Sequence, residues 1–239
     1  MTIKIWARSE DGTIDYISLT KEYVPGALNV LRKSFYREES DCLAAGVANS
    51  EDAMCEVDNF MTNMAKHGVS IVAVERKTNT VCGVAVNEIR EINTHPVVTH
   101  CVDKARHTAT KSFLKYVEEA DDLLSIFENC KVDCYIELFC LSILPEYRRR
   151  GIALTLAKVT EELTRQLSHG KPVKQSLDDS DLPLEPIPKM IAVIFTTHGS
   201  KRLGEKVGWE SARSLKMSFT KDDTDCFNVM FKKMSNSKV

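Results

Sequence analysis

The chain has 239 residues and a formal net charge of −2 at neutral pH, and 43% of its residues are hydrophobic and 28% charged. This length and composition suit a single globular domain with a full core, which we expect to span residues 1–239. Without a basic excess, broad binding to nucleic acid or to a membrane surface is not expected. No apolar stretch reaches the roughly 20 residues of a membrane span, and the N-terminus lacks a signal peptide's apolar core, so we expect a cytoplasmic protein.

The first half of the chain is predicted to contain both helices and strands. Apolar side chains spaced three and four apart after Thr20, with Pro25 near the start, predict an amphipathic helix. Two β-rich runs joined by Lys77 to Thr80 predict a hairpin. In chain order, the expected elements are a strand at 3–7, helices at 20–37 and 51–66, hairpin strands at 69–75 and 81–89, and a polar connection at 95–103.

The second half is predicted to alternate between helix and strand. The residues from 190 to 195 are all apolar, which is typical of a strand buried on both faces. Residues 168–188 contain four prolines and an acidic cluster, so we expect an irregular surface excursion there. The other expected elements are helices at 104–127, 152–167 and 197–206 and strands at 132–144, 209–220 and 225–231. The whole order predicts an α/β fold, with a mixed sheet and helices on both of its faces.

Eight cysteines are scattered along the chain without a Cys-x-x-Cys pair. Most lie in apolar runs, where a free thiol behaves as a small hydrophobic side chain, so we expect reduced cysteines in the core. His95, His100, Cys101 and His107 match no common zinc spacing, and we expect no metal.

A basic loop follows the strand expected at 132–144. It runs Arg148-Arg149-Arg150-Gly151, and a helix is expected to begin at Ile152. Backbone N–H groups at a helix N-terminus have no partner inside the helix, and the helix dipole adds positive potential there. Gly151 has no Cβ, so the backbone can approach a phosphate closely. This order of strand, basic loop and helix predicts a binding site for a phosphate-bearing ligand.

Two segments resemble the GCN5-related N-acetyltransferase (GNAT) superfamily. The pattern Arg148-x-x-Gly151-x-Ala153 resembles its pyrophosphate loop, and a helix followed by Gly208-Trp209 resembles its C-terminal signature. The resemblance implies a GNAT acyl-CoA N-acyltransferase fold, in which two central parallel strands, here 132–144 and 190–195, splay apart around the acetyl arm. It implies acetyl-coenzyme A as co-substrate, bound by Leu141, Ile143, Arg148, Arg149, Arg150, Gly151, Ile152 and Ala153.

A possible general base lies at the end of the first predicted helix. Insect arylalkylamine N-acetyltransferases carry an aromatic residue, two further residues, and an acidic pair followed by Pro-Leu, and the second acid is their catalytic glutamate. The run from Phe35 to Glu39 is similar, and the resemblance implies that Glu39 is the base. Ser40-Asp41 replaces Pro-Leu, so the resemblance keeps the carboxylate in place but does not fix the local turn or the shape of the amine pocket. By themselves, two glutamates at a helix end are commonly solvated charges.

Two hydroxyl side chains are candidates for the proton donor to the leaving thiolate. Many superfamily members place a tyrosine four residues before the Gly of the Gly-aromatic pair, but this chain has Gly204 there. The insect enzymes instead have two serines spaced by four, and these match Thr196 and Ser200. The resemblance implies that either hydroxyl contacts the thioester sulfur or orders water. Ser200 is also suited to capping a helix.

The function implied by the resemblance is transfer of an acetyl group to a small primary amine by direct attack in a ternary complex. An arylalkylamine is the first expectation, and polyamines or histamine-like amines are the alternative. Two other functions are alternatives: a non-catalytic acyl-coenzyme A-binding protein and a peptide N-terminal acetyltransferase. We expect a small-molecule amine substrate, no nucleic-acid or membrane partner, and a monomer or weak dimer.

Overall fold

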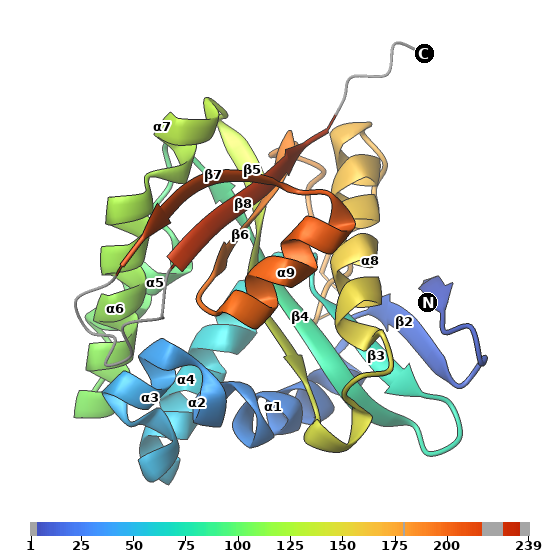
Figure 1. The fold of residues 1–239 in the computed structure, drawn as a ribbon, viewed down its shortest axis with the longest axis horizontal. Helices are drawn as coiled ribbons and strands as arrows, with labels where there is room; N and C mark the ends of the chain where they lie inside the picture. The colour runs from blue at the N-terminus through green and yellow to red at the C-terminus, as the bar shows by residue number, and fades with distance from the viewer. Residues whose placement is uncertain (1–3, 179, 217–226, 235–239) are drawn as a thin grey trace.

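One mixed β-sheet runs through the computed structural model, which describes residues 4–178, 180–216 and 227–234 (Figure 1). The strand order is β1-β2-β3-β4-β5-β6-β8-β7, and every neighbouring pair is antiparallel except β5 and β6. The strands are β1 (Ile5–Arg8), β2 (Ile14–Ser18), β3 (Ile71–Glu75), β4 (Thr80–Glu91), β5 (Cys134–Ile143), β6 (Met190–Phe195), β7 (Glu210–Leu215) and β8 (Phe227–Lys233).

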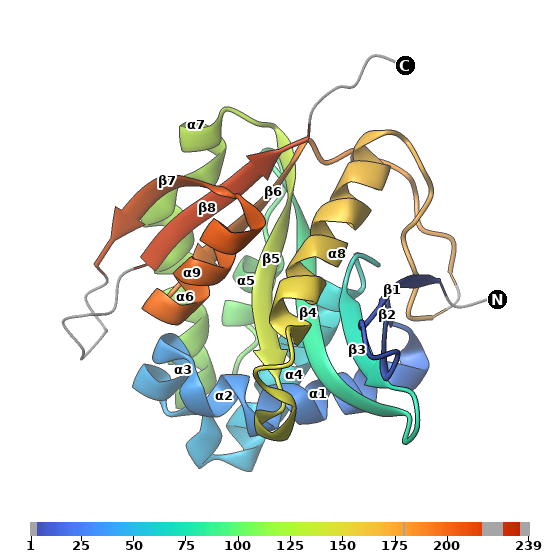
Figure 2. The same ribbon diagram turned by 45° about the vertical axis from the view of Figure 1, so that its right-hand side comes forward.

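Helices cover both faces of this sheet (Figures 1 and 2). One face packs on α8 (Ile152–Ser168) and α9 (His198–Val207), and Leu156 of α8 and Ile136 of β5 belong to the same buried core. The other face packs on α1 (Val24–Lys33), α4 (Glu51–Ala65) and α6 (Thr108–Leu124), through residues such as Phe60 and Phe113. The shorter helices are α2 (Phe35–Glu38), α3 (Ser40–Ala45), α5 (Val97–Val102) and α7 (Ile126–Cys130). The mixed sheet with helices on both faces is confirmed.

Within the described residues, no helix combines the length and the apolar character that a membrane span needs.

The parallel strands β5 and β6 separate soon after they meet. They pair only at Ile136 with Ile191 and at Glu137 with Ala192, although β5 continues to Ile143. On its other side β5 stays paired with β4, and a register shift there places Phe139 as an extra residue in a bulge. A bulge bends its strand and increases the local twist. The predicted splay of the two central strands is therefore confirmed.

The helix predicted over 20–37 is shorter than expected. It starts with a 3₁₀ turn at Lys21–Tyr23, continues as α1 and ends at Lys33, because Ser34 adopts φ −127° and ψ −74°. The short helix α2 follows, and Glu39 is extended, with φ −72° and ψ 138°, before α3 begins. The apolar periodicity continues through the break because Phe35 and Tyr36 are buried in the same core. Tertiary contacts thus decide where this helix ends.

Two other differences from the prediction concern short elements. Strand β2 was not predicted; its Asp15 pairs with Arg8 on β1, and its Ile14 and Tyr16 are buried. Helix α5 lies within the connection expected at 95–103. Residues 171–178 and 180–189 contain no helix or strand, as expected of the excursion. Parts of the strands expected at 3–7, 209–220 and 225–231, namely residue 3 and residues 217–220 and 225–226, lie outside the described residues.

Helix α9 packs closely on the sheet at Gly204. A Cβ at this position would lie 2.5 Å from Sδ of Met230 and 2.7 Å from Cε2 of Phe195. The residue that takes the place of the superfamily's tyrosine therefore faces the core rather than open space. The close contact leaves no room for an aromatic side chain at Gly204.

We predict that Gly204→Ala lowers the free energy of unfolding by about 1–3 kcal/mol, the usual cost of overpacking. The gain in helix propensity, at most about 1 kcal/mol, does not offset it. Gly199→Ala is the matched control, because its nearest neighbouring atom, Oγ1 of Thr197, is 3.9 Å from an added Cβ. Chemical denaturation measures both variants. Equal free energies of unfolding would show that α9 moves away from the sheet without cost.

Candidate functional site

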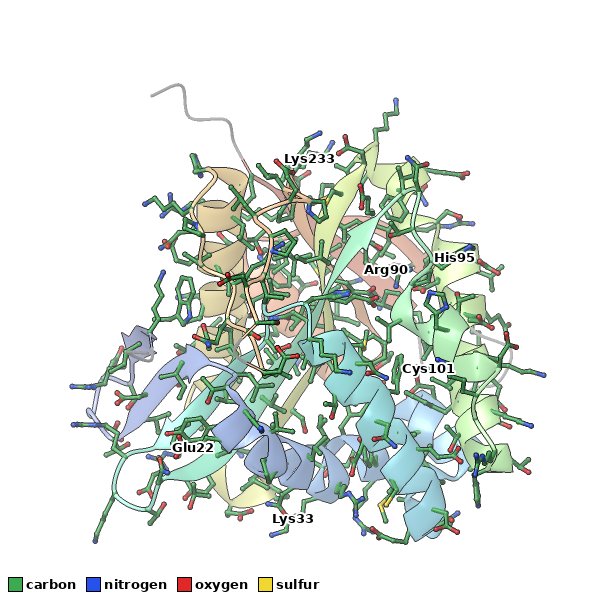
Figure 3. All side chains as sticks on the ribbon, turned by 180° about the vertical axis from the view of Figure 1, so that it is seen from behind. Glu22, Lys33, Arg90, His95, Cys101 and Lys233 are labelled. Atoms are coloured by element: carbon green, nitrogen blue, oxygen red, sulfur yellow. The ribbon has the colours of Figure 1, made fainter. Side chains whose placement is uncertain are left out.

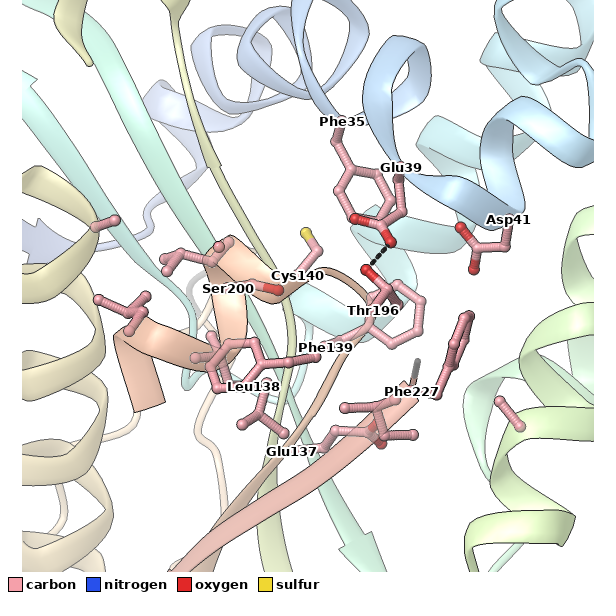
Figure 4. Close-up of a pocket in the computed structure, with 18 of the residues that line it drawn as sticks. Phe35, Glu39, Asp41, Glu137, Leu138, Phe139, Cys140, Thr196, Ser200 and Phe227 are labelled. Atoms are coloured by element: carbon pink, nitrogen blue, oxygen red, sulfur yellow. Dashed lines mark hydrogen bonds between the residues drawn. The ribbon is translucent and has the colours of Figure 1, made fainter. Parts of the chain in front are cut away.

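A cavity of about 440 Å³ occupies the gap between β5 and β6 (Figure 4). Its walls come from both faces of the sheet, since α3 and α6 contribute on one side and α8 and α9 on the other. Four phenylalanines supply much of its apolar surface: Phe35, Phe139, Phe195 and Phe227. Its polar lining includes Glu39, Asp41, Asp121, Glu137, Thr196 and Ser200. The cavity is thus an apolar pocket with a small set of acidic and hydroxyl groups, the usual composition of a small-molecule site.

Glu39 and Thr196, which are 157 residues apart, meet in this cavity. The break between α2 and α3 turns Glu39 towards the gap, and β6 ends just before Thr196. The Thr196 hydroxyl donates a hydrogen bond to Oε1 of Glu39, drawn as the dashed line in Figure 4. Because the Glu39 carboxylate also borders the cavity, one of its edges can face a bound molecule while the hydroxyl holds the other.

Asp41 is a second carboxylate beside Glu39, and it was not among the site residues expected from the sequence. It is 8% exposed, and its Oδ1 accepts a hydrogen bond from the backbone N–H of Cys42. Burial, followed by the charge of Glu39, raises the pKa of Asp41 to about 8. At neutral pH Asp41 is therefore mostly neutral, and Glu39 has no full like charge beside it. The available signal was a charged residue in place of the apolar leucine of the insect enzymes.

Ser200 lies at the first turn of α9 and is part of a capping box with Thr197. The backbone N–H of Ser200 donates to Oγ1 of Thr197, and Oγ of Ser200 contacts the backbone of Thr197. Ser200 also lines the cavity. Both expected hydroxyls thus border the site, but each has a partner inside the protein: Glu39 for Thr196 and Thr197 for Ser200.

A second hollow, of about 530 Å³, adjoins the first. It is bordered by residues of β5, of the following loop and of the start of α8 that were expected to bind the cofactor: Leu141, Ile143, Arg148, Arg149, Gly151, Ile152 and Ala153. The two hollows share Leu141, Ala153, Leu203 and Lys206. A groove therefore leads from the start of α8 to the carboxylate of Glu39. The gap between β5 and β6 leaves the edge of β5 open along this groove.

The loop before α8 has the backbone shape of an anion site. Arg149 and Gly151 both have positive φ, 62° and 76°, and Gly151 is the N-cap of α8. A Cβ at Gly151 would meet no atom within 4 Å, so its left-handed backbone conformation, rather than crowding inside the protein, favours glycine. The first N–H groups of α8 and the helix dipole face the hollow that this loop borders.

The three arginines of this loop point in different directions. Arg148 donates to Oγ of Ser34 and to the carboxylate of Glu38, at 2.7 Å each. Arg150 donates to Oγ1 of Thr13, and its guanidinium lies 5.5 Å from the Tyr147 ring centroid. Within the described part of the chain, Arg149 has no hydrogen-bond or ion-pair partner, and it borders the hollow. Only Arg149 therefore has an uncommitted guanidinium at the loop.

No group of three or more His, Cys, Asp or Glu side chains that could hold a metal ion occurs in residues 4–178, 180–216 and 227–234. The described cysteines are free thiols, and most of them are buried.

Comparison with known proteins identifies the fold. No protein-family model and no curated sequence matches the chain significantly. Among solved structures, putative arylalkylamine N-acetyltransferase 7 from the yellow fever mosquito Aedes aegypti matches with a TM-score of 0.74 at 17% identity, over 98% of this chain and 97% of that one. Arylalkylamine N-acetyltransferase 2 from Aedes aegypti matches with a TM-score of 0.72 at 18% identity, over 93% of this chain and 99% of that one.

A Drosophila melanogaster polyamine N-acetyltransferase, described as forming N-acetylagmatine, matches with a TM-score of 0.70 at 14% identity, over 92% of this chain and 99% of that one. At these identities the similarity is one of fold. The chain has the GNAT fold, in the form found in the insect arylalkylamine and polyamine N-acetyltransferases. The fold implied by the two sequence motifs is confirmed.

We predict that Asp41→Asn stabilises the protein increasingly as pH rises from about 4 to about 8. The native state keeps a proton on Asp41 that the unfolded chain, with an aspartate pKa near 3.9, has released. Over this window wild type loses up to about 1.4 kcal/mol of stability per pH unit through this group, and asparagine does not. Urea denaturation of both proteins near pH 5 and near pH 8 measures the difference. A difference that is the same at both pH values would contradict the assignment.

Proposed function

We propose that the protein is an N-acetyltransferase that moves an acetyl group from acetyl-coenzyme A to a small primary amine, by direct attack in a ternary complex. The contact between Glu39 and Thr196 carries this proposal, because it places a carboxylate in an apolar cavity at the end of a groove from a helix N-terminus. The GNAT fold supports the same reaction class. A protein that only senses acyl-coenzyme A would have no need of this carboxylate.

The residues around the groove suit acetyl-coenzyme A. The loop from Arg149 to Ala153 would hold its pyrophosphate through the N-terminal N–H groups of α8, aided by the free guanidinium of Arg149. When bound, it would supply the acetyl group as a thioester. The backbone N–H groups of Leu141 and Ile143, on the edge of β5 that β6 leaves open, would donate to an oxygen that gains negative charge.

Glu39 is the proposed general base. An alkylamine with a pKa near 10 arrives as a cation, and removing its proton at pH 7 costs about 4 kcal/mol. The carboxylate would accept this proton directly or through a water molecule. Thr196 holds Oε1 of Glu39 and so fixes the orientation of the carboxylate. Thr196 would therefore position the base. Ser200 would stabilise the start of α9 through the cap with Thr197 and would form part of the cavity wall.

Two substrate classes fit different parts of the cavity. The aromatic side chains of Phe35, Phe139, Phe195 and Phe227 favour an arylalkylamine, whose ring would pack against them. The acidic lining favours a polyamine or a guanidino-amine, and one similar structure is described as acting on agmatine. The two classes differ in whether the end of the substrate remote from the reacting amine is apolar or charged.

We predict that Gly151→Val weakens binding of coenzyme A by at least about tenfold, or about 1.4 kcal/mol. A β-branched residue resists the φ of +76° that this position requires, so the loop before α8 would change shape. Gly12→Val is the matched control, because Gly12 also has positive φ and open space but lies in the turn between β1 and β2. Titration calorimetry measures both. Unchanged affinity in a folded Gly151→Val protein would contradict the loop assignment.

We predict that Glu39→Gln lowers kcat/KM by roughly 10²–10⁴ at neutral pH, the usual worth of a general base. Glutamine can still accept the Thr196 hydrogen bond, so affinity for coenzyme A should change little. The loss should shrink as the pH approaches the pKa of the amine, because the free amine needs no base. Glu22→Gln, an exposed glutamate that borders neither hollow, is the control. Full turnover by Glu39→Gln at pH 7 would exclude Glu39 as the base.

A further inference from the structure

The end of the cavity remote from Glu39 is acidic and buried. Asp121 on α6 and Glu137 on β5 both border it, and Figure 4 shows Glu137 and Glu39 at opposite ends. Glu137 is 2% exposed and interrupts the apolar sequence of β5 at its last pair with β6. A carboxylate in the middle of a buried strand has a large desolvation cost, so its surroundings must supply compensating groups.

One arginine faces three carboxylates at this end. Arg90, on the side of the sheet seen in Figure 3, donates from Nη1 to Oε2 of Glu137 and from Nη2 to Oδ2 of Asp121, at 2.8 Å each. Oε2 of Glu88 lies 3.7 Å from Nη1 of the same guanidinium. Fully ionised, these four side chains would carry two uncompensated negative charges in the interior. Such an excess is relieved by protonation or by a bound cation.

One carboxylate oxygen of Asp121 and one of Glu137 have no hydrogen-bond partner among the described residues. Oδ1 of Asp121 is buried without a hydrogen bond among the described residues. Oε1 of Glu137 has no hydrogen bond there either, since Arg90 contacts only Oε2. Buried acceptors normally find a donor, and leaving one unpaired costs about 1–3 kcal/mol. Burial, against the charge of Arg90, raises the pKa of Glu137 to about 8 and also raises the pKa values of Asp121 and Glu88, so protonation removes part of the excess negative charge at neutral pH while the cavity is empty.

We propose that Asp121 and Glu137 form a subsite for a second positive charge, an ammonium or guanidinium group, at the far end of the amine substrate. This inference rests on the proposed function, because it assumes that the reacting amine lies beside Glu39. Phe139 and Phe227 line the cavity together with both acidic ends and would contact the apolar chain that joins the two charges. The protein is then selective for diamines or guanidino-amines over amines with a single charge.

Cadaverine and pentylamine test the subsite, because they have the same carbon chain and differ by one terminal amine. With acetyl-coenzyme A, wild type should show a kcat/KM for cadaverine at least about tenfold above that for pentylamine, as expected where buried polar groups need a partner on the substrate. Asp121→Asn and Glu137→Gln should remove most of this preference, because each lowers kcat/KM for cadaverine more than for pentylamine. Asp122→Asn, the exposed neighbour on α6, should keep the preference.

The wild-type comparison decides the inference even if a buried variant fails to fold. Equal kcat/KM for cadaverine and pentylamine, or a preference for pentylamine or phenethylamine, would overturn the subsite and leave the proposed acetyltransferase intact. Absence of turnover with all three amines would instead contradict the proposed function. Calorimetry of cadaverine and pentylamine with the protein saturated by coenzyme A provides a readout without turnover, and tighter binding of cadaverine in wild type but not in Asp121→Asn is the expected result.

Discussion

The separation of β5 from β6 is the constraint on which the site depends. A parallel pair would normally continue its hydrogen bonds, yet here only two residue pairs are formed before the strands part. The bulge at Phe139 bends β5, while the opposite edge of β5 stays hydrogen-bonded to β4. The pairing with β4 therefore fixes the position of the open edge. The same gap removes backbone groups from pairing, creates a cavity that crosses the sheet, and brings helices from both faces to its walls.

The proposed base is fixed by contacts that span most of the chain. Glu39 sits at a helix break held by the buried Phe35 and Tyr36, and Tyr36 in turn donates to Asp58 on α4. Its carboxylate is held from the opposite side of the gap by Thr196 at the end of β6. Packing in the apolar core therefore fixes the position of the Glu39 carboxylate. Because the neighbouring Asp41 is mostly neutral near pH 7, Glu39 does not have a second full negative charge beside it.

Strong local signals in the sequence predicted most of the elements of the sheet, although β2 was missed. The all-apolar run of β6, the hairpin of β3 and β4 and the glycine that starts α8 follow from local chemistry, and the elements lie where the patterns predict them. The break at Ser34 could not be predicted, because burial of Phe35 keeps the helical period through it. The acidic end of the cavity was also missed: Asp121 and Glu137 become neighbours only through their common partner Arg90, 31 and 47 residues away.

Arg148 connects the two halves of the site through a weak contact. Its pair with Glu38 is 40% and 49% exposed on the two side chains, and such pairs contribute at most about 1 kcal/mol. Glu38 directly precedes Glu39, so the side chain of the anion loop reaches the helix that ends at the proposed base. A phosphate at the loop can draw the guanidinium away at little cost. If phosphate binding breaks the contact between Arg148 and Glu38, it also frees α2 from the loop. By thermodynamic linkage, a protein in which α2 is already free of the loop must bind phosphate more tightly by the same factor.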